Sequence, residues 1–202
     1  MNLKSVKLAY SSENGQLNDA KIKRLEQFKD KYPVIARQEG GPGVLLMNPN
    51  DKSTIAILPD RIVFDYNGEN LNIENIPVES DLHRLTETLI LDRTAKTSIQ
   101  FIAQQNEENE DAMSFSLSFL PSITDIWNEV SGLGLRLLFE ASENQMWEVK
   151  IEPLLRNIKQ FHLEGICNYK TLSVEELSDQ LTIAYNFFKE ETNKYFQEGI
   201  IN

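Results

Sequence analysis

Short stretches in which apolar and polar residues alternate recur along most of the chain. A period of two is typical of a strand that is buried on one face only. Polar turn-forming residues separate neighbouring stretches, as at residues 48–51 and 59–60. The pattern predicts strands at residues 5–11, 44–48, 53–58, 61–67, 97–103, 114–120, 135–141, 145–154 and 160–169.

Apolar residues at helical spacing predict two helices in the first half of the chain. Asn18 can cap a helix that Pro33 ends, and a second helix fits residues 78–91. The glycine-rich segment 37–43 between them cannot hold a regular element, so we expect a loop there.

Two further helices are predicted in the second half. Ser122 can cap a short helix, and the capping box Ser173-x-x-Glu176 opens a long C-terminal one. The apolar stripe of this last helix comprises Leu177, Leu181, Ala184, Phe188 and Tyr195.

The predicted elements follow a similar order in the two halves of the chain. Residues 1–94 read as strand, helix, three strands and helix, and residues 95–202 repeat this order with one extra strand near the start. We expect an α+β fold in which two similar halves, related by a pseudo-twofold axis, form antiparallel sheets with helices packed on one side. The element order resembles the saddle fold of TATA-binding protein, and no DNA-binding residue carries over. Two unrelated meandering hairpins would give the same order, so duplication is one of two interpretations.

Charge and composition narrow the classes of partner. The 202 residues carry a formal net charge of −11, which disfavours nucleic acid and anionic membrane as partners. No apolar run reaches the roughly 18 residues that a membrane-spanning helix needs. Because Cys167 is the sole cysteine and the first residues do not resemble a signal peptide, we expect a cytoplasmic protein.

Residues that could carry catalysis or bind a metal are sparse. His162 and Cys167 are five residues apart on one predicted strand, so they point to opposite faces, and His83 is the only other such ligand. The segments 40–43 and 132–134 are rich in glycine, but they precede strands, whereas phosphate-binding loops open helices. We therefore expect no metal, no cofactor and no enzymatic activity. An enzyme that uses only carboxylates remains an alternative, because sequence does not show the distance between them.

Three cations on predicted strands are candidate ligand-binding residues. Arg136, Arg61 and Lys150 lie on the polar faces of their strands and would line one surface of a curved sheet. Arg136 is the first candidate, because an arginine between apolar neighbours on a central strand would need an anionic partner. Cross-strand ion pairing is the simpler account of all three, since it requires no ligand.

An acidic connector is a candidate contact for a protein partner. Glu107, Glu108, Glu110 and Asp111 lie between two predicted strands. Such a composition is typical of a solvated loop whose charge favours solubility. The functional alternative is an acidic loop that inserts into a basic partner, since function concentrates in exposed loops.

Four segments, at residues 25–38, 45–68, 132–140 and 194–200, resemble a sporadically distributed family of uncharacterised bacterial and phage proteins. The third segment departs from the family pattern, because Leu137 and Leu138 stand where an aromatic and then a polar residue are expected. The resemblance implies an α+β fold and a bacterial or phage source, and it supplies no catalytic residue.

Two functions fit these observations. The first is a noncatalytic interaction or regulatory protein, such as an inhibitor, an immunity protein or an antitoxin-like factor. The second is a protein that binds a small anionic ligand, such as a nucleotide, in a cleft between the halves or on the sheet face. In either case the open edges of a sheet could pair two copies into a homodimer.

Overall fold

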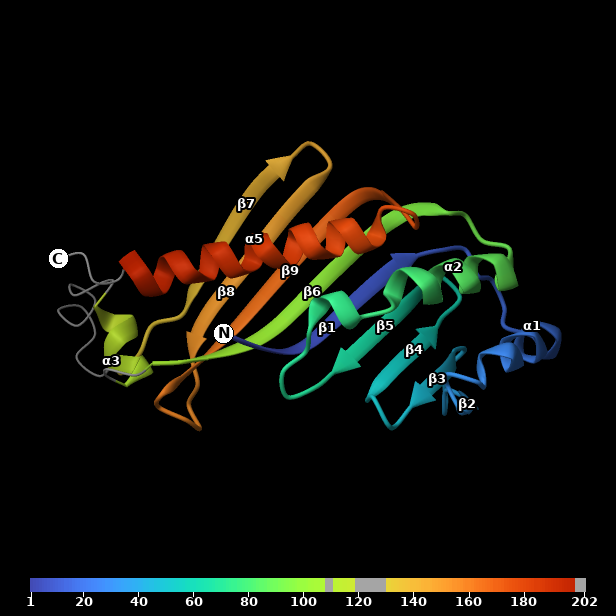
Figure 1. The fold of residues 1–202 in the computed structure, drawn as a ribbon, viewed down its shortest axis with the longest axis horizontal. Helices are drawn as coiled ribbons and strands as arrows, with labels where there is room; N and C mark the ends of the chain where they lie inside the picture. The colour runs from blue at the N-terminus through green and yellow to red at the C-terminus, as the bar shows by residue number, and fades with distance from the viewer. Residues whose placement is uncertain (108–110, 119–129, 199–202) are drawn as a thin grey trace.

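The computed structural model describes residues 1–107, 111–118 and 130–198. Nine strands form a single antiparallel sheet in the order β2-β3-β4-β5-β1-β6-β9-β8-β7 (Figure 1). The strands are β1 Asn2–Ser11, β2 Val34–Arg37, β3 Val44–Asn48, β4 Ser53–Ile57, β5 Arg61–Asn67, β6 Thr94–Asn106, β7 Leu135–Ser142, β8 Gln145–Pro153 and β9 Gln160–Ser173.

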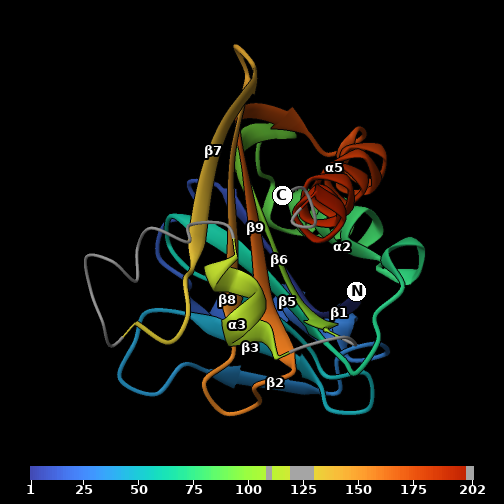
Figure 2. The ribbon, with the colours of Figure 1, turned by 90° about the vertical axis from the view of Figure 1, so that its left-hand side faces the viewer.

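The helices of the described part lie on one face of this sheet. Figure 2 shows α5 and α2 side by side on the same side of the strands. They are α1 Asp19–Leu25, α2 Val78–Leu89, α3 Ala112–Leu117 and α5 Leu177–Glu198, with 3₁₀ turns η1 Glu26–Phe28 and η2 Ile73–Asn75. None of these helices is long and apolar enough to cross a membrane. No described element covers the opposite face, which we call the open face.

The strand order divides the sheet between the two halves of the chain. Strands β1 and β6 pair in the middle, and each half contributes its remaining described strands on its own side. The boundary at residues 94–95 falls at the start of β6. The prediction of an α+β fold with antiparallel strands and helices on one side is confirmed at this level.

The predicted strand at residues 114–120 is wrong where the structure describes it. The segment forms helix α3, because Asp111 caps its first turn by accepting hydrogen bonds from the backbone N–H and the hydroxyl of Ser114, both at 2.8 Å. Ser116 donates to the carbonyl of Met113 in the same turn. The extra strand therefore does not lie here, and the helix expected after Ser122 falls outside the described residues, apart from its last position.

The sequence pattern also missed an edge strand. Residues Val34–Arg37 form β2, so the described strands of the first half outnumber those of the second. Asn18 caps α1 as predicted, but α1 ends at Leu25 and continues only as a 3₁₀ turn. Helix α5 begins at Leu177, after Glu176 has accepted a hydrogen bond from the Ser173 hydroxyl at 2.8 Å.

Aromatic side chains fill the core under α5. The ring of Phe101 on β6 lies 5.7 Å from that of Phe188 and 6.4 Å from that of Trp147, with near-parallel planes. Gly165 faces Phe188 from β9, and a Cβ at this position would lie 2.5 Å from Cδ2 of that ring. The absence of a side chain at Gly165 therefore allows the helix to approach the sheet.

The core under α2 contains a charged cluster instead. Asp81 on α2 is 4% exposed, and both of its carboxylate oxygens accept hydrogen bonds from Lys31 Nζ, at 2.8 and 2.7 Å. The hydroxyls of Tyr32 and Tyr66 donate to the same carboxylate at 2.7 and 3.3 Å. Burial, and then the Asp81 carboxylate, raise the pKa of Tyr32 far above its ordinary value. The Asp81 cluster thus ties α2 to β5 and to the segment after α1.

Candidate functional site: the open face of the sheet

The register of the strands identifies the side chains of the open face. Residues directly opposite each other on neighbouring strands point to the same side of a sheet. One row of such partners crosses all nine strands, in the order Ala36, Leu45, Ala56, Val63, Ala9, Ser98, Asn168, Met146 and Glu140.

This row is apolar in the first half of the sheet, whereas beyond its centre the polar Ser98, Asn168 and Glu140 accompany the exposed Met146. From β2 to β1 it contains small or medium apolar side chains, and all of them are partly exposed. The adjacent row adds Val34, which is 41% exposed, and Met47. We call these partly exposed apolar residues of the open face the apolar strip. It consists of Val34, Ala36, Leu45, Met47, Ala56, Val63 and Ala9.

Charged residues form a ladder on the open face of the second half. Arg136 on β7 pairs with Glu148 on β8 at 2.6 Å. Lys150 lies 3.1 Å from Glu148 and 2.8 Å from Glu164 on β9. Glu164 also accepts a hydrogen bond from Gln100 on β6. The structure therefore brings Arg136 and Lys150 together, each with a carboxylate, as cross-strand ion pairing predicts.

The contacts of the ladder stabilise its charged forms. The hydrogen bond from Arg136 is the largest influence on Glu148 and lowers its pKa. Burial is the largest influence on Glu164 and acts to raise its pKa, but the hydrogen bonds from Lys150 and Gln100, together with the nearby charge of Lys150, lower this pKa overall. The hydrogen bonds that Lys150 donates to Glu164 and Glu148 raise the pKa of Lys150. All four charges therefore persist at neutral pH.

Arg61, the third predicted cation, does not join this ladder. It begins β5, which is separated from β8 by β1, β6 and β9, a distance of about 19 Å at the usual strand spacing. Its nearest carboxylate is that of Asp60, at 3.5 Å. The three cations consequently do not converge on one ligand.

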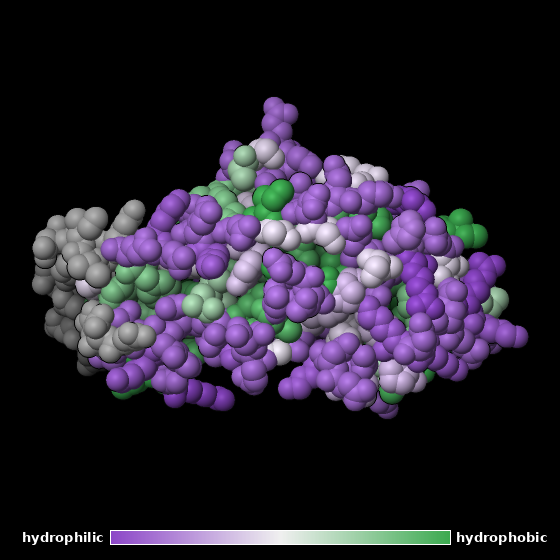
Figure 3. Space-filling view, viewed as in Figure 1, coloured by the Kyte–Doolittle hydropathy of each residue, from purple (hydrophilic) through white to green (hydrophobic). Residues whose placement is uncertain are grey.

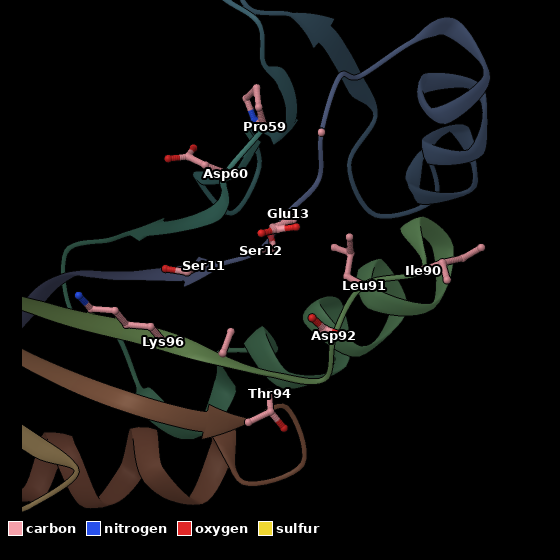
Figure 4. A pocket seen from close by; sticks show the side chains of 12 residues that line it. Ser11, Ser12, Glu13, Pro59, Asp60, Ile90, Leu91, Asp92, Thr94 and Lys96 are labelled. Carbon is pink, nitrogen blue, oxygen red and sulfur yellow. The ribbon is translucent and has the colours of Figure 1, made fainter.

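A pocket of about 840 Å³ opens near Arg61, where β1, the β4–β5 turn and the α2–β6 connection meet (Figure 4). Its side chains include the carboxylates of Glu13, Asp60 and Asp92, with Lys96 as the cation. Figure 4 shows Lys96 and the three carboxylates on different segments around the opening. Because carboxylates outnumber the cation, the lining disfavours an anionic ligand.

The acidic connector lies partly outside the described residues. Glu108 and Glu110 are in the part that is not described. The backbone N–H of Glu107 donates to the carbonyl of Lys159 at 2.9 Å, and Asp111 caps α3. The hydrogen bonds from Ser114 lower the pKa of Asp111. Two of the four acidic residues thus have local structural contacts.

Cys167, His162 and His83 lie apart from one another. Cys167 is buried on the helix-bearing side, and burial raises the pKa of its thiol to about 11. His162 is on the same strand but pairs in register with Glu152 on the open side, as the spacing predicts. His83 lies on α2, 3.3 Å from Glu87. Among the described residues, no group of three His, Cys, Asp or Glu side chains could hold a metal ion.

Sequence reasoning missed two features: the apolar strip and the Asp81 cluster. The strip could have been found by listing the residues that alternate with the buried ones on strands 44–48, 53–58 and 61–67, because several of them are themselves apolar, namely Leu45, Met47, Ala56 and Val63. The Asp81 cluster joins residues 15 to 50 positions apart, so no local pattern indicates it.

Comparisons with known proteins add little to this geometry. No protein-family model matches the chain, and no curated protein matches it. One solved structure with a similar arrangement is Methanococcus jannaschii TBP, at 14% identity and a TM-score of 0.43, covering 94% of this chain and 98% of that one.

Proposed function

We propose that this chain is a noncatalytic protein-interaction or regulatory protein, and that another protein binds to the open face of its sheet. The observation that carries the proposal is the apolar strip, because its side chains remain partly exposed although the opposite face supplies the core. Inhibitors, immunity proteins and antitoxin-like factors of bacteria or phages work by such contacts. A cytoplasmic location and two duplicated halves in a saddle-like sheet are parts of the same proposal.

The chemistry of the open face suits a protein partner. A protein interface typically has an apolar centre that is surrounded by polar residues. The apolar strip has this arrangement, since Lys7 and Asp65 pair at 3.4 Å beside it and the charged ladder follows on β8 and β9. The small side chains of Ala9 and Ala56 on either side of Val63 keep the strip flat, so another surface can approach closely.

The other large face is a poorer candidate. On the helix-bearing side most surface residues are hydrophilic, and hydrophobic surface shows mainly between α5 and the elements beside it (Figure 3). Ile183 on α5 is exposed there, at 55%. This residue provides a matched control, because it is apolar and accessible but lies on the opposite side of the molecule.

The test compares the native mass of three forms of the protein after gentle purification from a lysate of its host. We expect the wild-type chain and the Ile183→Glu variant to carry an additional protein of several kilodaltons. The Val63→Glu variant should lose it, because a carboxylate would be buried in the apolar interface without a partner. The thermal midpoint of each variant checks that it is folded, and Met47→Glu serves as a second substitution in the strip.

Two results would contradict this proposal. The wild-type chain could carry no protein, or both strip variants could retain the partner while folded. An added mass of a few hundred daltons would instead support the alternative of a small anionic ligand. That alternative has less support, because Arg136, Lys150 and Arg61 each have a carboxylate within 3.5 Å. A thermal-shift panel of nucleotides tests it separately, since a ligand at a hundred times its Kd stabilises by roughly 2.7 kcal/mol.

A further inference from the structure

The two edges of the sheet differ in length and in exposure. Strand β2 has 4 residues, whereas β7 at the other edge has 8, and β7 stands at the margin of the molecule with its β8 hairpin (Figures 1 and 2). Natural sheets protect their edges by keeping them short or charged, because an open edge offers unpaired backbone groups to another strand. Edge β7 is neither short nor strongly charged.

Apolar side chains are exposed on both sides of β7. Leu138 on the open face is 69% exposed, and Leu137 on the helix-bearing side is 36% exposed. In the part of the chain that the structure describes, β7 pairs with β8 alone. No other described strand therefore occupies the outer side of β7, where its backbone groups can pair with a further strand.

The sequence of β7 is complementary to itself in the antiparallel direction. In a register centred on Leu138, Arg136 of one copy stands opposite Glu140 of the other, and this pair occurs twice. Leu138 faces its own copy, and Leu137 faces Phe139. Opposite charges and apolar pairs in such positions each contribute about 0.2–1 kcal/mol, whereas a shift of one residue would place the charges opposite apolar side chains.

We propose that two copies of this chain associate through antiparallel pairing of β7 with β7, centred on Leu138, so that one sheet continues through both copies. The interface is isologous, with a twofold axis perpendicular to the sheet at Leu138. Both sets of helices then lie on the same side.

The intramolecular contacts of β7 are compatible with this pairing. The guanidinium of Arg136 is bound to Glu148 on one side, but its side chain remains 64% exposed and can accept the second carboxylate from Glu140 of the copy. On the other side of the strand, Phe139 contacts Phe187 of α5 with ring centroids 5.5 Å apart. The Leu137–Phe139 pairs would therefore extend the aromatic core of each copy across the boundary.

The first test uses charge reversal and sedimentation of the full chain. At micromolar concentration the wild type should have twice the 23.2 kDa mass of one chain. Arg136→Glu and Glu140→Arg each put like charges opposite each other twice, so each variant should dissociate with a Kd at least about tenfold higher. A mixture of the two variants restores both opposite-charge pairs and should form a heterodimer.

A second test fixes the register. Leu138→Cys places one thiol opposite its copy, so mild oxidation should link the two chains by a disulfide. Met146→Cys is the matched control, because it is exposed on the same face, at 51%, but lies one strand further in and should not be linked. The native Cys167 is buried and does not compete.

Neither test needs the partner of the open face, so the two proposals can fail separately. A monomeric wild type, a dimer that both charge variants retain, or equal linking of the Leu138→Cys and Met146→Cys chains would overturn the β7 pairing. Recovery of the dimer only in the mixture of charge variants supports it, because a merely destabilised fold would not be rescued by mixing.

Discussion

In the first half of the sheet the buried charges lie between helix and strands, around Asp81, and the open face carries the apolar strip with the Lys7–Asp65 pair beside it. In the second half the charges of Glu148 and Glu164 lie on the open face, and the space under α5 is filled by aromatic rings. The difference between the two halves is visible in one row of core-facing partners that crosses the sheet. In order, these partners are Ser53, Tyr66, Val6, Phe101, Gly165 and Val149.

This difference shows that one order of elements can hold its helices by two kinds of contact. Helix α2 buries apolar side chains such as Leu82 and Leu85 and is bound in addition through the hydrogen bonds of Asp81. These bonds fix the orientation of the helix, because an unpaired buried group is costly. Helix α5 is bound through ring contacts at Gly165, which depend on matched volumes. The open face of the sheet differs between the two halves as well, and the apolar strip of the first half is available for a partner.

The largest expected effect comes from breaking the polar contact under α2. Asp81→Ala should lower the free energy of unfolding by about 3 kcal/mol, because Lys31 and two tyrosine hydroxyls would lose their common acceptor. Denaturant unfolding measures this change. Asp81→Asn keeps the shape and part of the hydrogen bonding, so it should cost less. A loss below 1 kcal/mol for the alanine variant would mean that the cluster does not hold α2.

The next largest loss of stability is expected at the contact between Gly165 and the Phe188 ring under α5. Gly165→Ala should destabilise the protein by about 2 kcal/mol, because its Cβ would lie 2.5 Å from Cδ2 and 2.9 Å from Cγ of the buried Phe188 ring. Gly134→Ala is the control, since its Cβ would meet only the flexible side chain of Glu152. Adding Phe188→Leu to Gly165→Ala should cost less than the sum of the two single changes, and strict additivity would argue against the clash.

A smaller effect is expected on the open face of the second half. Lys150→Met should cost about 1 kcal/mol or less, because the pair is partly exposed and Glu148 keeps Arg136 while Glu164 keeps Gln100. The same unfolding measurement compares it with Asp81→Ala. Equal losses in the two variants would contradict the contrast between a buried cluster and a surface ladder.

Lowering the pH should weaken the ion pairs of this ladder and so reduce their contribution to stability. The pKa values of Glu148 and Glu164 are lowered in the folded chain, so their contribution is present above the ordinary glutamate value of 4.5 and is lost as the pH falls through the lowered values. Stability measured from neutral pH down to about pH 3 should therefore fall less steeply in Lys150→Met than in the wild type. Identical slopes would show that Lys150 does not hold these two pKa values down.

The strands could be predicted from the sequence because half-buried strands alternate, as β8 and β9 do clearly, and because polar turns separate the more apolar β3 and β4 from their neighbours. The segment 114–120 alternates as well, yet its first residues form α3. There the local hydrogen bonds of Asp111 with Ser114 support a helical turn, and Phe115 packs against Phe161 with ring centroids 5.8 Å apart. Alternation alone does not exclude a short capped helix.

The candidate site could be predicted only in part. Alternation on β8 places Glu148 and Lys150 on one face, and the cross-strand pairing that the sequence favoured accounts for Arg136. The separation of Arg61 from these residues depends on the strand order, which no local pattern determines. The apolar strip also depends on the strand order, because its residues come from β1, β2, β3, β4 and β5 and are brought together by the pairing of these strands.

The smallest expected change in stability is a gain rather than a loss. Ile90 ends α2 at φ 57°, a left-handed conformation that is costly for a β-branched residue, and its side chain is 81% exposed. Ile90→Gly should raise the free energy of unfolding by about 0.5–1 kcal/mol, because glycine adopts this conformation without a steric penalty and little apolar contact is lost. Combined with Asp81→Ala, the gain should persist unchanged, since the two sites share no hydrogen-bond partner. A loss of stability in Ile90→Gly would show instead that the exposed isoleucine makes a contact that stabilises the first half.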